Sequence, residues 1–285
     1  MILQNDNDFK TDTCRCGTCP DISVSYRSNR FNHRMAVLLV LGFLLLVPFV
    51  SATDYILTAA SSDQIRSGIH YTGKDELTLE IGENVTIDST SGTGIDSSAP
   101  VIIRSPQGKT LTVRVRNDTG VLFGITAPSV SVESGNLDII VTGNIDGAKG
   151  LACGIYSSEG NVTVSGGSVS TAVETTGHKN KGIYASRYII ISGGRVNATQ
   201  QGGANTFGLD GGNADNNKTD TGVQVTGGYI QVHSAGGRAR NVGIDSKFGT
   251  VDISGNTVLV IRTDGSGSQQ NYAFNPNITT IHGGW

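Results

Sequence analysis

The densest group of oxygen-bearing side chains lies in GLDGGNADNNKTDTG, the segment that begins at Gly208. Carboxylates, amides and carbonyls are the ligands that calcium takes, about six to eight oxygens at a time. The segment lacks the Gly and Glu of an EF-hand loop, so we predict an irregular calcium site, with a plain solvated turn as the alternative. The predicted ligands are Asp210, Asn213, Asp215, Asn217, Asp220 and, from the following repeat, Asp245.

Two tyrosines have the spacing of a sugar-binding pair. Tyr156 and Tyr184 each follow a Gly-Ile dipeptide, so we expect them to stack one repeat apart on an outer face. Exposed aromatic rings bind sugars because ring faces pack against pyranose C–H groups. The alternative is an aromatic pair that only stabilises neighbouring strands.

Catalytic signatures are missing from the sequence. The N-T-D, D-D, G-H-G and R-I-K motifs of polygalacturonase-like enzymes do not occur, and Gly177-His178-Lys179 is the nearest fragment. Glycoside hydrolysis usually needs two carboxylates that face a sugar, and only Asp210 and Asp245 are expected on neighbouring repeats. We therefore expect a protein that is not an enzyme, with a polysaccharide lyase or glycoside hydrolase as an alternative.

These candidate residues sit in an internal repeat. The segments that begin at Gly154, Gly182 and Gly243 read GIYSSEGNVTVSGGSVST, GIYASRYIIISGGRVNAT and GIDSKFGTVDISGNTVLV. Equivalent starts recur every 26 to 35 residues, at Gly68, Gly94, Gly124, Gly154, Gly182, Gly208 and Gly243. The third position of each copy forms a column: His70, Asp96, Thr126, Tyr156, Tyr184, Asp210 and Asp245. Recurrence at such a period is the signature of a solenoid, in which stacked copies bury one continuous core.

Each copy also holds two alternating apolar pairs, which predict short strands with one buried face. The pairs before the glycine corner are Val162/Val164, Ile189/Ile191, Val223/Val225 and Val251/Ile253. The pairs after it are Val169/Thr171, Val196/Ala198, Ile230/Val232 and Val258/Val260. The pattern predicts an all-β fold, a single-domain right-handed parallel β-helix of about seven to eight coils over residues 53–285. A β-sandwich or β-propeller is the alternative.

The pattern Gly-Ile-Tyr/Asp, then V-x-V/I-x-G-G-x-V/I, resembles secreted prokaryotic β-helix proteins of the cell-surface carbohydrate-binding type. It also resembles the wider pectate-lyase-like superfamily and repeat proteins expected on methanogen surfaces. The resemblance covers about residues 68–285 and rests on scaffold residues, so it supports the fold better than the function. It implies binding of acidic or cellulosic polysaccharides, often with calcium.

The N-terminal part indicates export. An uncharged run of 15 residues, Ala36–Val50, follows a basic stretch and precedes the small residues Ser51 and Ala52. We assign residues 35–52 to a signal peptide and residues 1–34 to a leader of uncertain status; an uncleaved anchor, the one expected contact with a membrane, is the alternative. Three cysteines, Cys14, Cys16 and Cys19, lie in the leader and lack a fourth ligand for a structural zinc site.

The composition and the glycosylation sequons indicate the protein's location and kind of partner. The chain has 285 residues, 16% of them charged, and a net charge of −3, so no broad basic surface favours nucleic acid. Six sequons are candidate glycosylation sites: Asn84, Asn117, Asn161, Asn197, Asn217 and Asn277. We expect Asn84, Asn161 and Asn277 to share one corner of the coil. The expected protein is secreted or on the cell surface and binds a polysaccharide or cell-surface glycan, or mediates adhesion; a structural envelope protein is the competing class.

The signal predicts where the mature chain begins. Cleavage after Ala52 should give a mature protein that starts at or near Thr53, because charge, apolar run and small residues occur in the order that a signal peptidase requires. N-terminal sequencing of the exported protein measures this directly. A product that retains residues 36–50 would show a membrane anchor instead.

Overall fold

The computed structural model describes residues 53–58, 65–145, 150–212, 220–265 and 270–282, together with two short strands near the N-terminus. These two strands, β1 (Thr13–Cys14) and β2 (Ile22–Ser23), pair antiparallel within a unit that comprises Met1–Val50. The second unit comprises Ser51–Trp285. The expected signal peptide at 35–52 lies outside the described residues.

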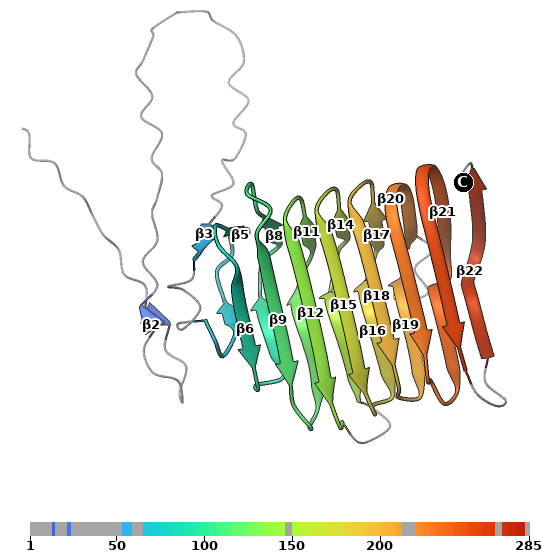
Figure 1. The fold of residues 1–285 in the computed structure, drawn as a ribbon, viewed down its shortest axis with the longest axis horizontal. Coiled ribbons are helices and arrows are strands. Elements are labelled where there is room, and N and C mark those ends of the chain that lie inside the picture. Colours follow the sequence, from blue (N-terminus) through green and yellow to red (C-terminus); the bar gives the residue numbers. More distant parts are fainter. Residues whose placement is uncertain are drawn as a thin grey trace, which may run out of the picture. The chain divides into compact units, whose positions relative to one another are not determined.

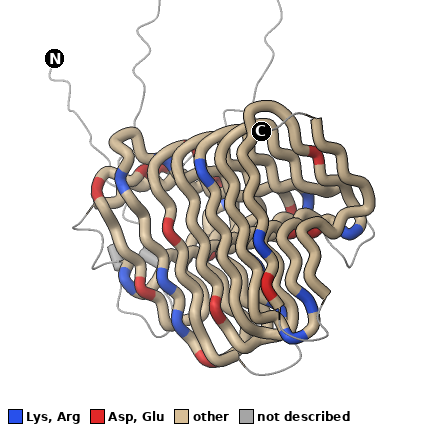
Figure 2. The backbone as a smooth tube through the Cα atoms, turned by 45° about the vertical axis from the view of Figure 1, so that its right-hand side comes forward, with Lys and Arg blue, Asp and Glu red and all other residues tan. Residues whose placement is uncertain are grey.

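The second unit is a parallel β-solenoid of about seven turns, and its described residues contain no helix. In Figure 1 the strands nearest the viewer run downward while successive coils advance to the right, which is a right-handed winding. Figure 2 shows the same coils as a stack of parallel tubes. The predicted all-β solenoid is therefore confirmed.

Each coil contributes one strand to each of three parallel ladders. The glycine ladder contains β4 (Ile69–Tyr71), β7 (Thr93–Ser97), β10 (Val121–Ala127), β13 (Leu151–Ser157), β16 (Lys179–Ala185), β19 (Asn205–Gly211) and the first parts of β21 (Arg240–Asp264) and β22 (Gln270–His282). The middle ladder contains β3 (Thr53–Leu57), β5 (Leu77–Ile81), β8 (Val101–Arg104), β11 (Val130–Val132), β14 (Val162–Val164), β17 (Tyr188–Ile191), the first part of β20 (Gly222–Ala235) and later parts of β21 and β22. The return ladder contains β6 (Val85–Ser89), β9 (Thr110–Arg116), β12 (Asn136–Gly143), β15 (Ser168–Thr175), β18 (Arg195–Gln201) and the last parts of β20 and β21.

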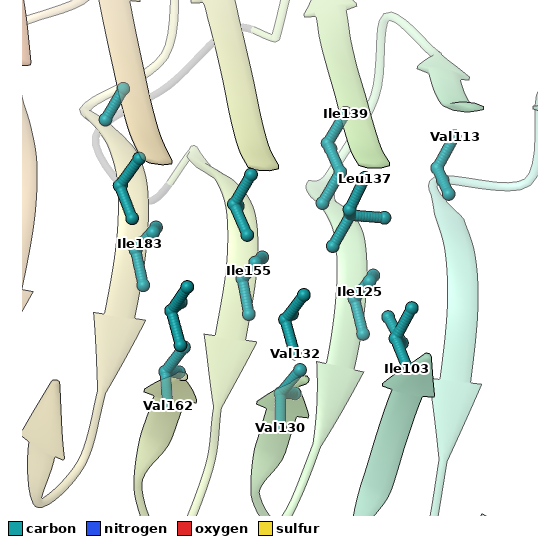
Figure 3. Close-up of a cluster of buried hydrophobic side chains, with 14 of the residues drawn as sticks. Ile103, Val113, Ile125, Val130, Val132, Leu137, Ile139, Ile155, Val162 and Ile183 are labelled. Atoms are coloured by element: carbon teal, nitrogen blue, oxygen red, sulfur yellow. The ribbon is translucent and has the colours of Figure 1, made fainter. Parts of the chain in front are cut away.

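The core is a column of aliphatic side chains from all three ladders. Period-two alternation sends every second residue inward, so Val162, Ile189 and Val223 stack in register and are fully buried. Figure 3 shows the same arrangement in the central coils, with Ile125 and Ile155 on neighbouring strands of the glycine ladder. The apolar pairs that the sequence predicts before the glycine corner are confirmed: they are buried and occupy equivalent core positions in successive coils.

Two kinds of glycine shape the coil. At the corner before the return ladder, Gly167 and Gly194 have φ angles of +71° and +74°, a backbone conformation that residues with a Cβ resist. From Gly94 onward, the glycine that begins each repeat has no such angle but lacks space: a Cβ on Gly124 would lie 2.2 Å from Ile139 Cγ2 of the return ladder. A Cβ on Gly154 would lie 2.6 Å from the carbonyl oxygen of Gly182 in the next coil.

One predicted pair is wrong. Val258 and Val260 point outward and are 43% and 44% exposed, while Leu259 and Ile261 take the inward positions beside Ile230 and Val232. The reason is a bulge: β21 has one more residue than β20 between the middle and return ladders, after Val225. An extra residue inverts the faces of everything that follows it in a strand.

The register predicts opposite outcomes for adjacent residues of β17. Ile191 is fully buried, whereas Ile190 points outward between Thr163 and Gln224. Ile191→Asp should lower the free energy of unfolding by several kcal/mol, because it buries an unpaired charge. Ile190→Asp should cost less than about 1 kcal/mol. Chemical denaturation of both variants checks this, and equal losses would contradict the register.

Candidate functional site

The glycine ladder carries an outer face that its glycines create. In β10, Leu122 faces inward and Phe123 outward; after Gly124, Ile125 faces inward and Thr126 outward. The strand pairing joins the residues on either side of Gly124 and leaves out the glycine itself. The alternation therefore slips by one residue at each glycine, and the residues that flank each Gly-Ile dipeptide both point outward.

Three columns of side chains result, and every coil from β10 onward contributes one residue to each column. The third-position column is confirmed in register and gains an eighth member: His70, Asp96, Thr126, Tyr156, Tyr184, Asp210, Asp245 and Asn275. The column before the glycine contains Thr93, Phe123, Cys153, Lys181, Phe207, Val242 and Tyr272. The edge column contains Val121, Leu151, Lys179, Asn205, Arg240 and Gln270.

Three aromatic rings lie in a row along this face, and two of them are stacked. The rings of Tyr156 and Tyr184 lie 4.8 Å apart at 18°, and Phe123 continues the row, 4.7 Å from Tyr156. The tyrosines thus form the stacked pair expected from their spacing, but their faces are turned toward each other rather than outward. Tyr184 is 6% exposed and Tyr156 is half-buried, so a ligand on this face would meet mainly ring edges.

A buried ion pair continues the row. Lys181 Nζ lies 2.7 Å from Asp210 Oδ2, and each side chain is only 11% exposed. The same ammonium group lies 3.8 Å from the centre of the Tyr184 ring, a cation–π contact. Charges removed from water need such partners, because an unpaired buried ion costs several kcal/mol.

Asp245 lies one coil beyond Asp210, as predicted. Burial, reinforced by the Asp210 carboxylate, raises the pKa of Asp245 to about 6. Asn275 Nδ2 donates a hydrogen bond to Asp245 Oδ1 at 2.6 Å. The sequence predicts that both carboxylates bind calcium, but in the structure Lys181 already supplies a positive charge to one of them, Asp210.

The other predicted calcium ligands do not join this pair in the described residues. Asp220 lies two residues before β20, which belongs to the middle ladder at this point. Arg187 Nη2 and the Tyr188 hydroxyl donate hydrogen bonds to its two carboxylate oxygens at 2.8 and 2.6 Å. These two hydrogen bonds lower the pKa of Asp220. Asn213, Asp215 and Asn217 lie outside the described residues. Within the described part, no group of three or more His, Cys, Asp or Glu side chains could hold a metal ion. The calcium site stays a prediction.

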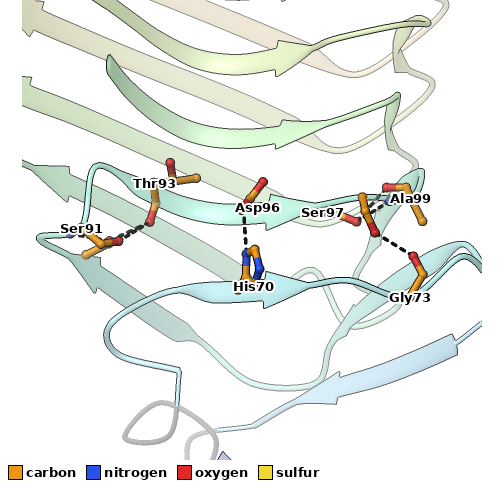
Figure 4. A network of polar contacts seen from close by, with 9 residues as sticks. His70, Gly73, Ser91, Thr93, Asp96, Ser97 and Ala99 are labelled. Carbon is orange, nitrogen blue, oxygen red and sulfur yellow. Dashed lines mark hydrogen bonds and ion pairs between the residues drawn. The ribbon is translucent and has the colours of Figure 1, made fainter. Parts of the chain in front are cut away.

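At the other end of the face the third-position column is polar. His70 Nδ1 and Asp96 Oδ2 lie 2.8 Å apart on neighbouring coils, and both side chains are exposed (Figure 4). The Ser98 hydroxyl donates to the carbonyl oxygen of Gly73 at 2.8 Å, which ties the same two coils together beyond the strands. The column therefore passes from an exposed polar pair, through stacked rings, to buried charges.

A shallow depression lies where return strands turn into the glycine ladder. It has a volume of about 440 Å³, and the polar residues around it include Thr142, Glu174, Thr176 and Gln201. Hydroxyl, carboxylate and amide groups on an open surface match the hydrogen-bonding groups of sugars.

Charges are sparse elsewhere. Figure 2 shows Lys, Arg, Asp and Glu as single positions scattered over the coils, with long uncharged stretches between them. An outer cation–π pair joins Arg195 and Tyr229 on the return ladder, with the guanidinium carbon 4.7 Å from the ring centre. This pair has the same residue types as the candidate face, on another side of the solenoid.

The sequons occupy different corners. Asn84 precedes β6 of the return ladder and accepts a hydrogen bond from the Thr110 amide, whereas Asn161 precedes β14 of the middle ladder and accepts one from the Tyr188 amide. Their predicted equivalence is wrong, because Val-Thr-Ile and Val-Thr-Val begin strands at two different corners; Asn277 shares the corner of Asn161. Asn117 directly follows β9, and its side chain donates a hydrogen bond to the carbonyl oxygen of Thr90, which follows β6. Asn197 lies within β18, and Asn217 lies outside the described residues. Glycosylation stays a prediction.

Sequence reasoning missed the residue before each glycine. Lys181 and Phe123 both take this position, and neither belongs to the Gly-Ile signature from which the columns were read. A signal was available at Lys181: in a regular strand it would share the inward face of Ile183, so a charged residue there indicates that the alternation slips. Asn275, the partner of Asp245, was hidden in the most diverged copy.

Comparison with protein-family models, with curated proteins and with solved structures found no match. No helix among the described residues is long and apolar enough to cross a membrane. The function is therefore inferred from the fold and from the geometry of the candidate face.

The buried carboxyl group predicts a pH-dependent stability. The pKa of Asp245 is about 6 in the folded state, above the ordinary value of 3.8, so the folded state holds this proton more tightly. Protonation of Asp245 therefore adds to the free energy of unfolding in full below about pH 4, and this contribution is lost as the pH rises through 6. Asp245→Asn should therefore stabilise the protein at pH 7.5 by about 1 to 3 kcal/mol, with little difference at pH 4. Denaturation of both proteins across this range measures the difference, and parallel pH profiles would contradict it.

Proposed function

We propose that this protein is an exported surface β-solenoid that binds carbohydrate, a polysaccharide or cell-surface glycan, and mediates adhesion without catalysis. The outer face of the glycine ladder is the proposed binding surface. It is a flat, regular array with one side chain per column in each coil, about 4.8 Å apart, which suits a ligand that is itself a chain of repeating units.

The proposal rests mainly on one observation: along the edge column, apolar side chains give way to hydrogen-bond donors. This column begins with the apolar Val121 and Leu151 and continues with the hydrogen-bond donors Lys179, Asn205 and Arg240. Phe123 and Tyr156, both half-buried, lie beside the apolar end. Sugars combine apolar C–H faces with hydroxyl groups, so a surface where aromatic edges adjoin donors offers both kinds of contact.

The carboxylate pair supports binding rather than turnover. Asp210 and Asp245 are 8% and 6% exposed, and each is engaged by a neighbouring side chain, Lys181 or Asn275. A glycosidase needs its two carboxyl groups open to the sugar. A hydrolase is the second candidate function, because the raised pKa of Asp245 next to the ion-paired Asp210 resembles the division between acid and carboxylate that such enzymes use.

Variants of two outward-facing, half-buried residues test the proposal. The protein should bind some members of a panel of soluble polysaccharides, measured by affinity electrophoresis or calorimetry with and without calcium. Tyr156→Ala combined with Lys179→Ala should weaken that binding at least about tenfold, a loss of about 1.4 kcal/mol. The double variant Tyr229→Ala with Arg195→Ala likewise removes one tyrosine and one basic side chain, but from the return ladder, and should bind as the parent does.

Other results point elsewhere. No binding to any polysaccharide by folded protein would favour a structural envelope protein. Equal weakening by the two double variants would move the site away from the glycine ladder. Release of reducing or unsaturated sugars that Asp245→Asn abolishes would establish the enzyme instead.

A further inference from the structure

Three ionisable side chains from successive coils meet on the glycine ladder. Lys181 lies on β16, Asp210 on β19 and Asp245 on β21, and β19 pairs with both of the other strands (Figure 1). The lysine side chain crosses to the next coil, where its Nζ atom lies 2.7 Å from Asp210 Oδ2. An amine and a carboxyl group in such contact hold all the atoms of an amide bond and of one water molecule.

This pair is shielded from water. The side chains of Lys181 and Asp210 are each 11% exposed, and the ring centres of Tyr184 and Phe207 lie 3.8 and 5.8 Å from Nζ. Both aromatic residues are themselves nearly buried, at 6% and 3% exposure. Water would compete with the amine for the carboxyl carbon and would reverse the formation of an amide, so its exclusion favours a bond between the two side chains.

Exposure and residue type separate this pair from an ordinary surface ion pair. Arg187 Nη2 and Asp220 Oδ2 come equally close, at 2.8 Å, but their side chains are 52% and 70% exposed. A guanidinium group stays charged in proteins and does not attack carbonyl carbons, whereas a lysine amine acts as a nucleophile once it has lost a proton. Lys181 therefore has a chemistry that Arg187 lacks.

The geometry of the pair favours attack. Because Cγ is one bond away from Oδ2, the Lys181 nitrogen lies less than about 4 Å from the carboxyl carbon of Asp210, close to the roughly 3 to 3.5 Å of reactants poised to combine. Paired strands hold both residues in register, so folding has already paid the entropy of bringing the two groups together.

We propose that Lys181 and Asp210 join through an isopeptide bond that forms spontaneously in the folded chain, with Asp245 as the proton carrier. One proton passes from the ammonium group to the Asp210 carboxylate, which leaves a neutral amine beside a neutral carboxylic acid. Nζ then attacks Cγ; Asp245 takes a second proton from the nitrogen and delivers it to a hydroxyl group of the tetrahedral intermediate, which leaves as water. The Nζ–Cγ bond forms, one Cγ–O bond breaks, and no atom is oxidised or reduced.

Asp245 is positioned for this role. It lies in register with Asp210 on the next coil, and Asn275 Nδ2 fixes its carboxyl group with a hydrogen bond to Oδ1 at 2.6 Å. A proton carrier has to accept and return a proton, and Asp245 ends the reaction in the state in which it began.

The bond locks one complete coil. It closes a ring over residues 181–210, from one strand of the glycine ladder round to the next. The coils of a solenoid contact only their neighbours, so a covalent link between two coils prevents them from separating one after the other. A disulfide does not supply such a link, because Cys153 is the single cysteine of the solenoid and is free. Resistance to pulling would suit an adhesive protein; this consequence rests on the proposed function, whereas the bond does not.

Mass spectrometry of the folded protein tests the bond directly. The intact chain should be about 18 Da lighter than its sequence requires, the mass of the water released. Digestion with trypsin should leave the bond after Lys181 uncut and should yield one branched peptide that contains both Lys181 and Asp210. A folded parent with the full mass of its sequence would overturn the proposal.

Three variants identify the participants. Lys181→Arg keeps the positive charge but cannot form the amide, so it should have its full mass and should melt at least about 5 °C below the parent, because the ring no longer restricts the unfolded chain. Lys247→Arg is the matched control: Lys247 is exposed two residues after Asp245, and this variant should keep the loss of 18 Da. Asp245→Asn should leave most chains unlinked, because an amide does not carry protons in this way.

One side reaction has the same mass. Asp210 precedes Gly211, and a succinimide between these two residues would also release one water. A succinimide yields no branched peptide and persists in Lys181→Arg, so that result would overturn the proposal. Complete linkage in Asp245→Asn would refute the role of Asp245. A linked protein that binds no glycan would leave this inference standing and refute only the proposed carbohydrate function.

Linkage also affects the pH comparison of Asp245→Asn with its parent. Loss of the bond would lower the stability of the variant at every pH and hide the effect of the buried carboxyl group. That comparison is therefore made in the Lys181→Arg background, where neither chain is linked.

Discussion

From Gly94 onward, the solenoid depends on a close approach between the glycine that begins each repeat and the return ladder. Gly94, Gly124 and Gly208 each lie where a Cβ would come within 2.0–2.2 Å of an inward Val or Ile side chain. It would also come within 2.5–2.8 Å of the carbonyl oxygen of the next repeat's glycine. No side chain fits into such a space, so the glycine ladder can pack this tightly only where the repeat places glycine.

The same glycine produces the outer face. Where the alternation slips, the residues on both sides of Gly-Ile turn outward, and large side chains from neighbouring coils crowd together over this ladder. Crowding explains why outward residues such as Tyr184, Asp210 and Asp245 are almost buried, although they lie outside the inner aliphatic column. It also accounts for the raised pKa of Asp245, because crowding removes water from a carboxyl group that has a second carboxylate for a neighbour. Perturbed groups of this kind concentrate at functional sites, which is why this face is the strongest candidate for binding.

Much of this arrangement could be predicted from the sequence, because residues at equivalent positions of successive repeats lie side by side when the coils stack. Aligned Gly-Ile units placed Tyr156 beside Tyr184 and Asp210 beside Asp245, and both pairs are in register. The failures come from local irregularities: one extra residue after Ser254 inverted Val258, and similar strand starts at two corners made Asn84 look equivalent to Asn161. Lys181 was missed for a different reason, since its outward direction depends on the slip at glycine, which is a property of backbone packing and not of residue type.

The stability of one glycine variant tests the central constraint most directly. Gly124 and Gly82 both have ordinary φ angles, but a Cβ on Gly82 would make only normal contacts at 3.5 Å. If the close approach organises the fold, Gly124→Ala should lower the free energy of unfolding by about 3 kcal/mol or more, because the added methyl group has to displace both a core side chain and backbone. Gly82→Ala should change it by less than about 1 kcal/mol. Equal and small effects of the two substitutions, measured by equilibrium denaturation, would contradict the account.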